Sequence, residues 1–280
     1  MNRIKVMING IPGNVAVVMA KHTLMDERFE LIPYSLTGPE ITENNYQLDD
    51  FSIKLLQPDK RDISIVEIKD KNGFFISIDY THPSAVNGNA EFYCRHRLPF
   101  VMGTTGGDRK LLAGTVAKSS ISAVIAPNMA KQIVGFQAMM EWCADAFPGL
   151  FTGYSLEIKE SHQKGKADTS GTAKALVECF RNMGVNCSEN NIIKERDPEI
   201  QKKIWGVPEK FLGGHGYHKY RLVSEDETVK FEFSHNINGR DIYVQGTLDA
   251  VVFLNQKLEE SIHGKVFSMI DVLRNGDETG

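Results

Sequence analysis

Apolar runs alternate with helix-compatible segments along the first half of the chain. Residues 4–8 (IKVMI) form a short apolar run that leads into a glycine turn and a helical pattern containing Val15, Val18 and Met19. Further β-rich runs follow at residues 29–36, 64–68, 74–86, 98–107 and 121–129. Because strands that alternate with helices form parallel sheets, this order predicts an α/β fold with a Rossmann-like, doubly wound parallel sheet.

The pattern changes from residue 129 onward. A long helix is predicted over residues 130–147, and a strand over residues 154–161 leads into a stretch rich in charged and hydroxyl side chains. Partial period-two alternation then predicts antiparallel strands at residues 216–224, 227–237 and 240–254, followed by a helix at 265–276.

These elements divide the chain into two domains. We expect a dinucleotide-binding domain at residues 1–128 and a second α+β domain with an open mixed sheet at residues 129–245. The C-terminal segment, residues 246–280, is expected to return to the first domain.

Composition narrows the class of protein. The 280 residues carry a net charge of -4. This charge argues against a protein that coats nucleic acid, because such a surface needs a clustered excess of Lys and Arg. The four cysteines show no CxxC spacing, which indicates free thiols in a reducing compartment. No apolar run approaches the ~18 residues of a membrane span, and a strand-like run begins within four residues of the N-terminus. We therefore expect a cytoplasmic protein, or a stromal one if a transit peptide has been removed.

A nucleotide-binding turn is predicted at the first strand–helix junction. Gly10-Ile11-Pro12-Gly13-Asn14-Val15-Ala16 is a GxxGxxA variant of the dinucleotide fingerprint, in which glycines let the backbone approach a pyrophosphate. Amides at the helix N-terminus supply donors for phosphate. Ligands of such sheets bind beyond the carboxyl ends of the strands, so loops 10–13, 79–83, 103–107 and 126–128 should line one crevice.

The end of the second strand carries the signal for the coenzyme. Residues 33–38 (PYSLTG) offer the hydroxyls of Ser35 and Thr37 and no carboxylate that would bind a ribose 2′-hydroxyl and repel a 2′-phosphate. NADPH is therefore the expected coenzyme, with NADH as the second candidate.

A second candidate site lies in the stretch ESHQKGKADTSGTAKAL, residues 160–176. An apolar stripe predicts a helix that begins near Ser170, so the free amides of Gly171 and Thr172 would form an anion site for a carboxylate. His162, Lys164 and Lys166 alternate upstream and would project to one side of an extended segment. This arrangement suits a substrate with more than one carboxylate, and an imidazole beside an ammonium provides a proton donor.

Together these residues resemble a known family, 4-hydroxy-tetrahydrodipicolinate reductase (dihydrodipicolinate reductase). The resemblance covers nearly the whole chain, and its most specific marker is His-x-x-x-Lys at His162 followed by SGTA at residues 170–173. Gln163 stands where the usual bacterial pattern has a second histidine, and a single Thr169 replaces Ala-Pro. Both departures resemble the plant-type subgroup.

The resemblance implies reduction by NAD(P)H of the cyclic imine derived from 4-hydroxy-tetrahydrodipicolinate, a step of diaminopimelate and lysine biosynthesis, by a homotetramer joined through the open sheet. It implies His162 as a proton donor or acceptor and Lys166 as a proton donor. The implied substrate ligands are Ser170, Gly171, Thr172, Arg240 and Gln163. The candidate cofactor ligands are Gly10, Ile11, Pro12, Gly13, Asn14, Val15, Ser35, Thr37, Asp79, Thr81, Gly103, Thr104, Thr105, Ala126, Pro127, Asn128 and Met129. No metal is implied.

Three alternatives stay open at this point. An aspartate-semialdehyde-type dehydrogenase would need a cysteine nucleophile, but Cys143 and Cys179 lie in helical patterns typical of core residues. An NADP-binding redox sensor would have lost its proton donors, whereas His162 and Lys166 are present. A zinc site at His215, His218 and His235 lacks a clear carboxylate or cysteine partner.

Overall fold

The computed structural model describes residues 3–275, and the chain in it forms two compact units. Unit 1 contains the chain up to Lys131 and again from Asp241, and unit 2 contains Gln132–Arg240. The boundaries expected from the sequence, 128/129 and 245/246, lie close to these positions. Of the expected C-terminal segment, residues 276–280 lie outside the described residues.

Unit 1 is built on a parallel sheet with the strand order β13-β8-β7-β6-β1-β2. Its strands are β1 (Ile4–Asn9), β2 (Phe29–Leu31), β6 (Ile76–Asp79), β7 (Phe100–Met102), β8 (Ala123–Ile125) and β13 (Val266–Phe267). Its helices are α1 (Asn14–Met25), α2 (Arg61–Asn72), α3 (Val86–Arg95), α4 (Arg109–Ala117), α8 (Ile242–Glu259) and α9 (Met269–Asn275), with a 3-10 turn η1 (Pro83–Ala85). The parallel, doubly wound sheet expected from the sequence is confirmed.

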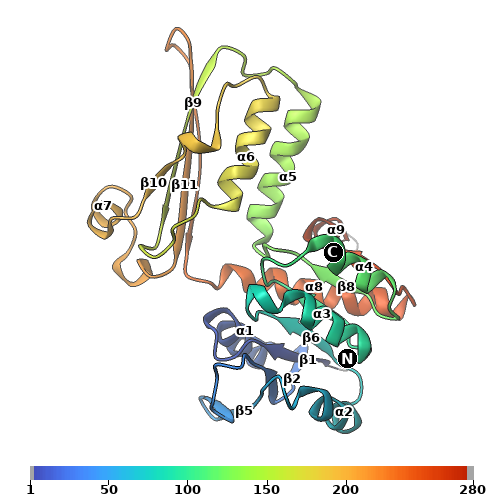
Figure 1. Ribbon diagram of the computed structural model, residues 1–280. Helices are drawn as coiled ribbons and strands as arrows, with labels where there is room; N and C mark the ends of the chain where they lie inside the picture. Colours follow the sequence, from blue (N-terminus) through green and yellow to red (C-terminus); the bar gives the residue numbers. More distant parts are fainter. Residues whose placement is uncertain (1–2, 276–280) are drawn as a thin grey trace. The chain divides into compact units, whose positions relative to one another are not determined.

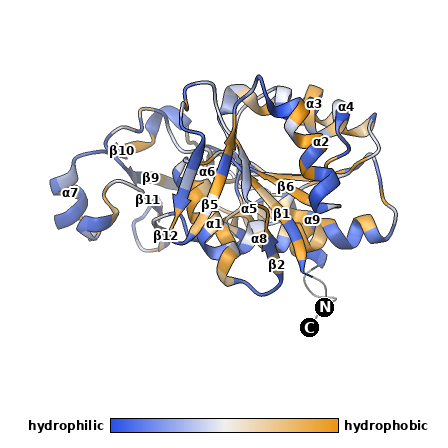
Figure 2. Cartoon of the chain, turned by 90° about the horizontal axis from the view of Figure 1, so that it is seen from below, coloured by the Kyte–Doolittle hydropathy of each residue, from blue (hydrophilic) through white to orange (hydrophobic). Residues whose placement is uncertain are grey.

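The central strands are apolar because helices cover both of their faces. All four residues of β6 are buried, as are the last four of β1. Most of β1 has the colour of hydrophobic residues in Figure 2. The chain leaves β1 toward β2 on one side of the sheet and returns to β6 on the other. The carboxyl ends of β1 and β6 therefore mark the point at which the winding direction reverses, where ligands of such sheets bind.

A small second sheet and two helices in unit 1 differ from the sequence expectation. Between residues 34 and 56 the chain forms a three-stranded sheet, β3-β5-β4, of which the sequence pattern predicts only the first strand. Its strands are β3 (Tyr34–Leu36), β4 (Asn45–Leu48) and β5 (Phe51–Leu56). The strands predicted at 64–68 and 240–254 are wrong, because these residues lie in α2 and α8. In α2 only Ile65 and Ile68 are buried, a spacing of three that fits one helix face.

Unit 2 is an open mixed sheet with helices on one face. The strand order is β10-β9-β11-β12, with β10 parallel to β9 and the other pairs antiparallel. The elements are α5 (Lys131–Ala146), β9 (Tyr154–His162), α6 (Gly171–Asn182), η2 (Glu189–Asn191), β10 (Ile193–Glu195), α7 (Pro198–Lys203), η3 (Glu209–Phe211), β11 (His215–Ser224) and β12 (Lys230–Asn238). Helices α5 and α6 lie side by side along the sheet (Figure 1), and their apolar faces form a core with Ile158, Tyr220 and Leu222. The predicted mixed sheet is confirmed.

Among the described residues, no helix is both long and apolar enough to cross a membrane.

Candidate active site

The glycine turn of unit 1 lies where the winding direction reverses. Gly10 follows β1 with φ of +106°, and a Cβ built on it would lie 2.2 Å from the carbonyl oxygen of Tyr80, which follows β6. Gly13 is the N-cap of α1 and has no side-chain cap, so the first amides of α1 are not occupied by a capping side chain. The glycines therefore allow two strand ends to meet closely while the positive end of α1 stays accessible, which fits a bound pyrophosphate.

Two other expected loops close the same end of the sheet. A Cβ on Gly103 would lie 2.4 Å from the ring of Tyr80, so the loop after β7 packs against the loop after β6. In the loop after β8, Ala126 donates its N–H to the carbonyl of Met102 at 3.0 Å. Helix α8 supports the loops after β6 and β8, because Gly246 packs against the carbonyl of Met129 and the hydroxyl of Thr247 is 2.6 Å from the hydroxyl of Tyr80. Thr105, Pro127 and Asn128 are not buried.

Asp79 has a different place from the one expected for a cofactor ligand. It is fully buried, and its carboxylate accepts hydrogen bonds at 2.6–3.1 Å from five donors. The donors are the N–H and hydroxyl of Thr81, the hydroxyl of Thr104, the amide of Asn89 and the hydroxyl of Tyr93. Asp79 therefore joins the loops after β6 and β7, and it does not face the crevice.

The hydroxyls expected to bind a 2′-phosphate are used inside unit 1. Ser35 is fully buried and accepts the N–H of Ile11 at 3.2 Å, so direct contact of Ser35 with a coenzyme is not supported. Thr37 donates its hydroxyl to the carbonyl of Ile11 at 2.9 Å. Both side chains hold the glycine turn in place.

A carboxylate that the sequence analysis missed lies beside them. A Cβ built on Gly38 would lie 2.3 Å from either carboxylate oxygen of Glu40, so the Glu40 side chain folds back over the end of the β3 segment. Glu40 stands two residues beyond the segment 33–38 at the strand end. Its signal in the sequence is an acidic residue just after a Gly-Pro turn, because a turn can bring a side chain back to the strand end.

In unit 2 two of the expected substrate residues, His162 and Arg240, lie at one end of the sheet, where β9 and β12 end and β11 begins. Strand β9 ends at His162, which pairs with Gly216 near the start of β11, and His215 pairs with Asn238 at the end of β12. Arg240 follows β12, and its guanidinium lies over Gly214, 3.0 Å from a Cβ built there. His162 and Arg240, far apart in sequence, are thus brought to the same end of the sheet.

The imidazole of His162 is half-buried and has a defined tautomer. Its Nδ1 is 3.0 Å from the carbonyl oxygen of His215 and must donate to it, which leaves Nε2 without a proton in the neutral ring. That Nε2 faces Nε2 of His218 at 3.4 Å. Burial, opposed by the nearby Glu160 carboxylate, lowers the pKa of His162 to about 4, so the ring is neutral at physiological pH.

The N-terminus of α6 is open toward solvent beside the lysine. Ser170 is the N-cap and makes no side-chain cap, and a Cβ built on Gly171 would meet no atom within 4 Å. The ammonium of Lys166 is 3.3 Å from the carboxylate of Asp168, on the same loop. The helix start therefore offers donors and room for a carboxylate, with a cation nearby. Gln163 begins this loop, and its backbone carbonyl accepts the N–H of Lys166 at 2.9 Å.

Two charged residues that the sequence analysis did not single out lie beneath the loop. Glu160 is fully buried, and its carboxylate oxygen Oε1 is 2.5 Å from the guanidinium of Arg196. Its other oxygen accepts the N–H of Ser170 at 3.0 Å. Arg196 could not have been found by its spacing, because its partner is 36 residues away.

The zinc site considered from the sequence does not form. His215 is occupied on both ring nitrogens, by the hydroxyl of Ser161 at 2.9 Å and the carbonyl of Phe211 at 3.2 Å. Among the residues described, Glu160, His162 and His218 form a group with metal-ligand spacing. Both oxygens of Glu160 are already hydrogen-bonded, and the guanidinium of Arg196 opposes a second cation, so we assign no metal to this group.

Lowering the pH from 7 to 5 should destabilise the protein through these histidines. Burial lowers the pKa of His235 to about 4, and burial also lowers the pKa of His218. In the unfolded chain these histidines take up protons below their ordinary pKa of ~6.5, whereas in the folded chain they stay neutral. The free energy of unfolding therefore falls as the pH is lowered from about 6.5 to about 4. Thermal melts across this range should show a smaller loss of Tm in His235→Gln than in the parent. The exposed His263→Gln is the control, and an unchanged slope in His235→Gln would contradict the assignment.

The cysteines do not provide a nucleophile. Burial raises the pKa of Cys94, Cys179 and Cys187, which disfavours the reactive thiolate, and Cys143 lies half-buried in α5. The alternative of an aspartate-semialdehyde-type dehydrogenase is therefore not supported.

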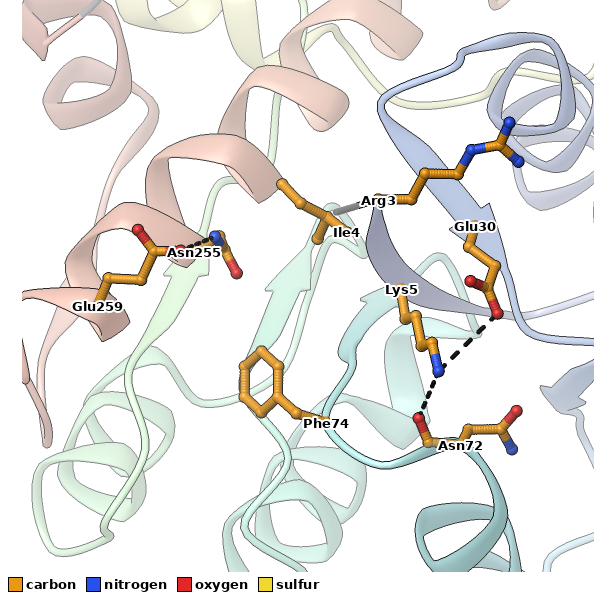
Figure 3. A pocket seen from close by; sticks show the side chains of 8 residues that line it. All are labelled: Arg3, Ile4, Lys5, Glu30, Asn72, Phe74, Asn255 and Glu259. Atoms are coloured by element: carbon orange, nitrogen blue, oxygen red, sulfur yellow. Dashed lines mark hydrogen bonds and ion pairs between the residues drawn. The ribbon is translucent and has the colours of Figure 1, made fainter. Parts of the chain in front are cut away.

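A cavity of about 420 Å³ lies in unit 1, away from the glycine turn (Figure 3). It is lined by the first residues of β1 and by Asn72, Phe74 and the end of α8, and Lys5 contacts Glu30 and Asn72 across it. These are the amino ends of the parallel strands. Because ligands of such sheets bind at the carboxyl ends, this cavity does not belong to the candidate site.

Comparison with known proteins gives consistent matches. Residues 4–129 match the family described as "Dihydrodipicolinate reductase, N-terminus", and residues 133–273 match "Dihydrodipicolinate reductase, C-terminus". The protein named "Probable 4-hydroxy-tetrahydrodipicolinate reductase 1, chloroplastic" from Oryza sativa subsp. japonica is 44% identical over 272 residues, 97% of this chain and 79% of the relative. "4-hydroxy-tetrahydrodipicolinate reductase 2, chloroplastic" from Arabidopsis thaliana is also 44% identical, over 99% of this chain and 79% of the relative.

A solved structure shows the same fold. It is a dipicolinate-bound dihydrodipicolinate reductase from Paenisporosarcina sp. TG-14, with a TM-score of 0.65 at 19% identity, and the match covers 95% of this chain and 98% of that one.

Proposed function

Because this chain belongs to the dihydrodipicolinate reductase family, we propose that it reduces the cyclic imine derived from 4-hydroxy-tetrahydrodipicolinate to tetrahydrodipicolinate. The observation that carries the proposal is the loop between β9 and α6 in unit 2. The imidazole of His162, the ammonium of Lys166 and the open N-terminus of α6 all belong to this loop or adjoin it. The plant-type pattern of the sequence agrees with the identity to plant relatives.

Unit 1 binds the nicotinamide cofactor in this proposal. The close approach of Gly10 to Tyr80 and the free start of α1 fit a pyrophosphate, and the loops after β7 and β8 are candidates for the nicotinamide side. The residues proposed to contact this cofactor directly are Gly10–Val15, Thr81, Gly103–Thr105 and Ala126–Met129. When bound, the reduced cofactor supplies the hydride.

Unit 2 binds the substrate and supplies the proton. The amides of Gly171 and Thr172 bind one carboxylate at the start of α6, the Ser170 hydroxyl assists, and Arg240 binds a carboxylate with its fork-shaped guanidinium. Lys166 donates the proton, because the neutral His162 has none on Nε2. Bound carboxylates add negative charge beside His162 and would raise its pKa, so His162 shares the proton in the loaded site.

The test is a spectrophotometric assay of NADPH and NADH oxidation, with the substrate generated from pyruvate and aspartate semialdehyde by the upstream synthase. Oxidation that depends on the substrate supports the reductase. Folded protein that binds NADPH and oxidises neither coenzyme would support the alternative of a sensor without catalysis.

Arg240→Ala should raise KM for the substrate by about tenfold or more while kcat changes less, because a charge-assisted pair to a carboxylate is lost. Steady-state kinetics at saturating coenzyme measures both constants. Arg181→Ala, an exposed arginine near the end of α6, is the matched control. A KM within twofold of the parent would return Arg240 to the role of a turn residue over Gly214.

Glu40→Gln should increase kcat/KM for NADPH relative to NADH by about three- to tenfold, because an exposed carboxylate repels a 2′-phosphate only moderately. The preference for NADPH stays a prediction, and Glu40 acts against it. The ratio for both coenzymes is measured in parent and variant. Glu43 is exposed in the same loop, and Glu43→Gln should leave this ratio unchanged. An equal ratio in all three proteins would exclude Glu40 as a determinant of the coenzyme preference.

The assembly and compartment stay predictions. We propose a homotetramer joined through the unit 2 sheet, which carries helices α5 and α6 on one face only, and light scattering during gel filtration measures its mass. The plant relatives are named as chloroplastic, which favours the stroma of a plastid over the cytoplasm if the source has plastids.

A further inference from the structure

A buried ion pair lies beneath the loop that carries Lys166. Glu160 is fully buried on β9, and the side chain of Arg196 is 18% exposed. Isolated charges are rarely buried, and a pair persists only where further hydrogen bonds satisfy both partners. Here both partners are satisfied by the backbone of the candidate substrate site.

Arg196 holds the loop from below. Its Nε donates to the carbonyl of Lys166 at 2.8 Å, and its NH2 group is 3.5 Å from the carbonyl of Asp168 in addition to its contact with Glu160. The third nitrogen, NH1, donates to the carbonyl of Glu195 on β10 at 2.9 Å. One guanidinium thus connects strand β9, strand β10 and two carbonyls of the loop.

Glu160 fixes the start of α6. Its Oε2 accepts the N–H of Ser170 at 3.0 Å, so the residue before the helix is bound by protein while the amides of Gly171 and Thr172 are left for a ligand. A lone carboxylate in this place would repel a carboxylate of the substrate. The charge of Arg196 neutralises it, which keeps the helix start attractive to anions.

We propose that Arg196 is a positioning residue, which through Glu160 and the loop carbonyls fixes Lys166 and the anion-binding start of α6. The inference rests on the proposed function. A lysine cannot replace the arginine, because only the guanidinium has donors for the carboxylate and the carbonyls in one plane.

The experiment compares Arg196→Met, Arg196→Lys and the double variant Glu160→Gln/Arg196→Met in the full chain. The control is Arg181→Met, which removes an exposed pair with Glu178 farther along α6. The probe is pyridine-2,6-dicarboxylate, titrated calorimetrically, alongside kcat and KM for the substrate, Kd for NADPH, and Tm. For Arg196→Met we expect dicarboxylate binding weaker by about 10- to 100-fold and a higher KM, with Kd for NADPH within twofold.

The other variants separate positioning from general stability. Arg196→Lys should recover less than half of the lost affinity on a logarithmic scale, since it restores charge without the fork. The double variant should bind the probe about fivefold or more tightly than Arg196→Met, because the uncompensated carboxylate is gone. A purely structural role would lower Tm while KM and probe affinity of the folded protein stay at parent values, and that result would overturn the proposal.

Trypsin gives a readout that does not depend on activity. The loop contains Lys164 and Lys166, so cleavage after these residues reports how firmly the loop is held. Arg196→Met should be cleaved there about tenfold faster than the parent or Arg181→Met. Equal cleavage rates would overturn the inference, even if the parent neither turned over the substrate nor bound the dicarboxylate. Failure of the parent in those two assays would instead count against the proposed function.

Discussion

Replacing Lys166 with alanine should lower kcat by about 100-fold or more, the usual contribution of a positioned acid. The reason is the neutral His162, whose Nδ1 proton is bound to a carbonyl and whose Nε2 carries none, so we expect the lysine ammonium to be the proton source in the free site. Unit 1 is not altered, and Kd for NADPH should stay within twofold. Stopped-flow single-turnover kinetics with saturating coenzyme measures the chemical step directly.

Lys164→Ala is the matched control for this experiment. It removes an exposed ammonium two residues away on the same loop, so a general electrostatic attraction of the dianionic substrate would weaken in both variants. A large loss of kcat in Lys166→Ala alone assigns the proton to Lys166. Equal kcat in Lys166→Ala and the parent would remove Lys166 from the acid role and leave His162 as the remaining candidate.

Gly10→Ala should weaken NADPH binding by about 100-fold or more, since strain at positive φ costs roughly 1–3 kcal/mol and steric overlap adds to it. The added methyl would lie 2.2 Å from the carbonyl oxygen of Tyr80. The turn must therefore move away from β6, and the free amides at the start of α1 move with it. Fluorescence titration with NADPH measures the effect, and circular dichroism verifies that the variant is folded.

Gly73→Ala separates backbone strain from steric overlap. Gly73 also has a positive φ, +71°, but a Cβ built there would meet no atom within 4 Å. This control should lose stability without losing coenzyme affinity. If Gly10→Ala bound NADPH as tightly as Gly73→Ala, the glycine turn would not be the pyrophosphate site.

Local patterns predicted the fold well wherever one signal dominated. The strand, glycine turn and helix around Gly10 were predictable because apolar spacing and a glycine at a tight approach act over a few residues. The helix from Gly171 was predictable from its apolar stripe, and Gly184, with φ of +94°, ends it. The strands predicted at 64–68 and 240–254 failed because a short apolar run fits a buried strand and one face of a helix equally well.

The supporting residues of the site could not be predicted from the sequence. Asp79 was expected to face a cofactor, and only the structure shows that Asn89, Tyr93 and Thr104 already surround its carboxylate. Arg196 is connected to the loop only through contacts between strands. Such contacts depend on strand order and register, which one sequence does not specify.

The return of the chain to unit 1 has a consequence for its synthesis. Strand β13 completes the parallel sheet beside β8, and α8 packs against β6, β7 and β8, yet both are made after the whole of unit 2. Domains generally fold in order as they leave the ribosome. Here unit 2 is complete first, while the nascent nucleotide-binding sheet keeps an open edge and an uncovered apolar face until residues 242–267 emerge. A nonsense mutation in the codons just after Arg240 would therefore damage the sheet built by the N-terminal half of the chain and leave unit 2 intact.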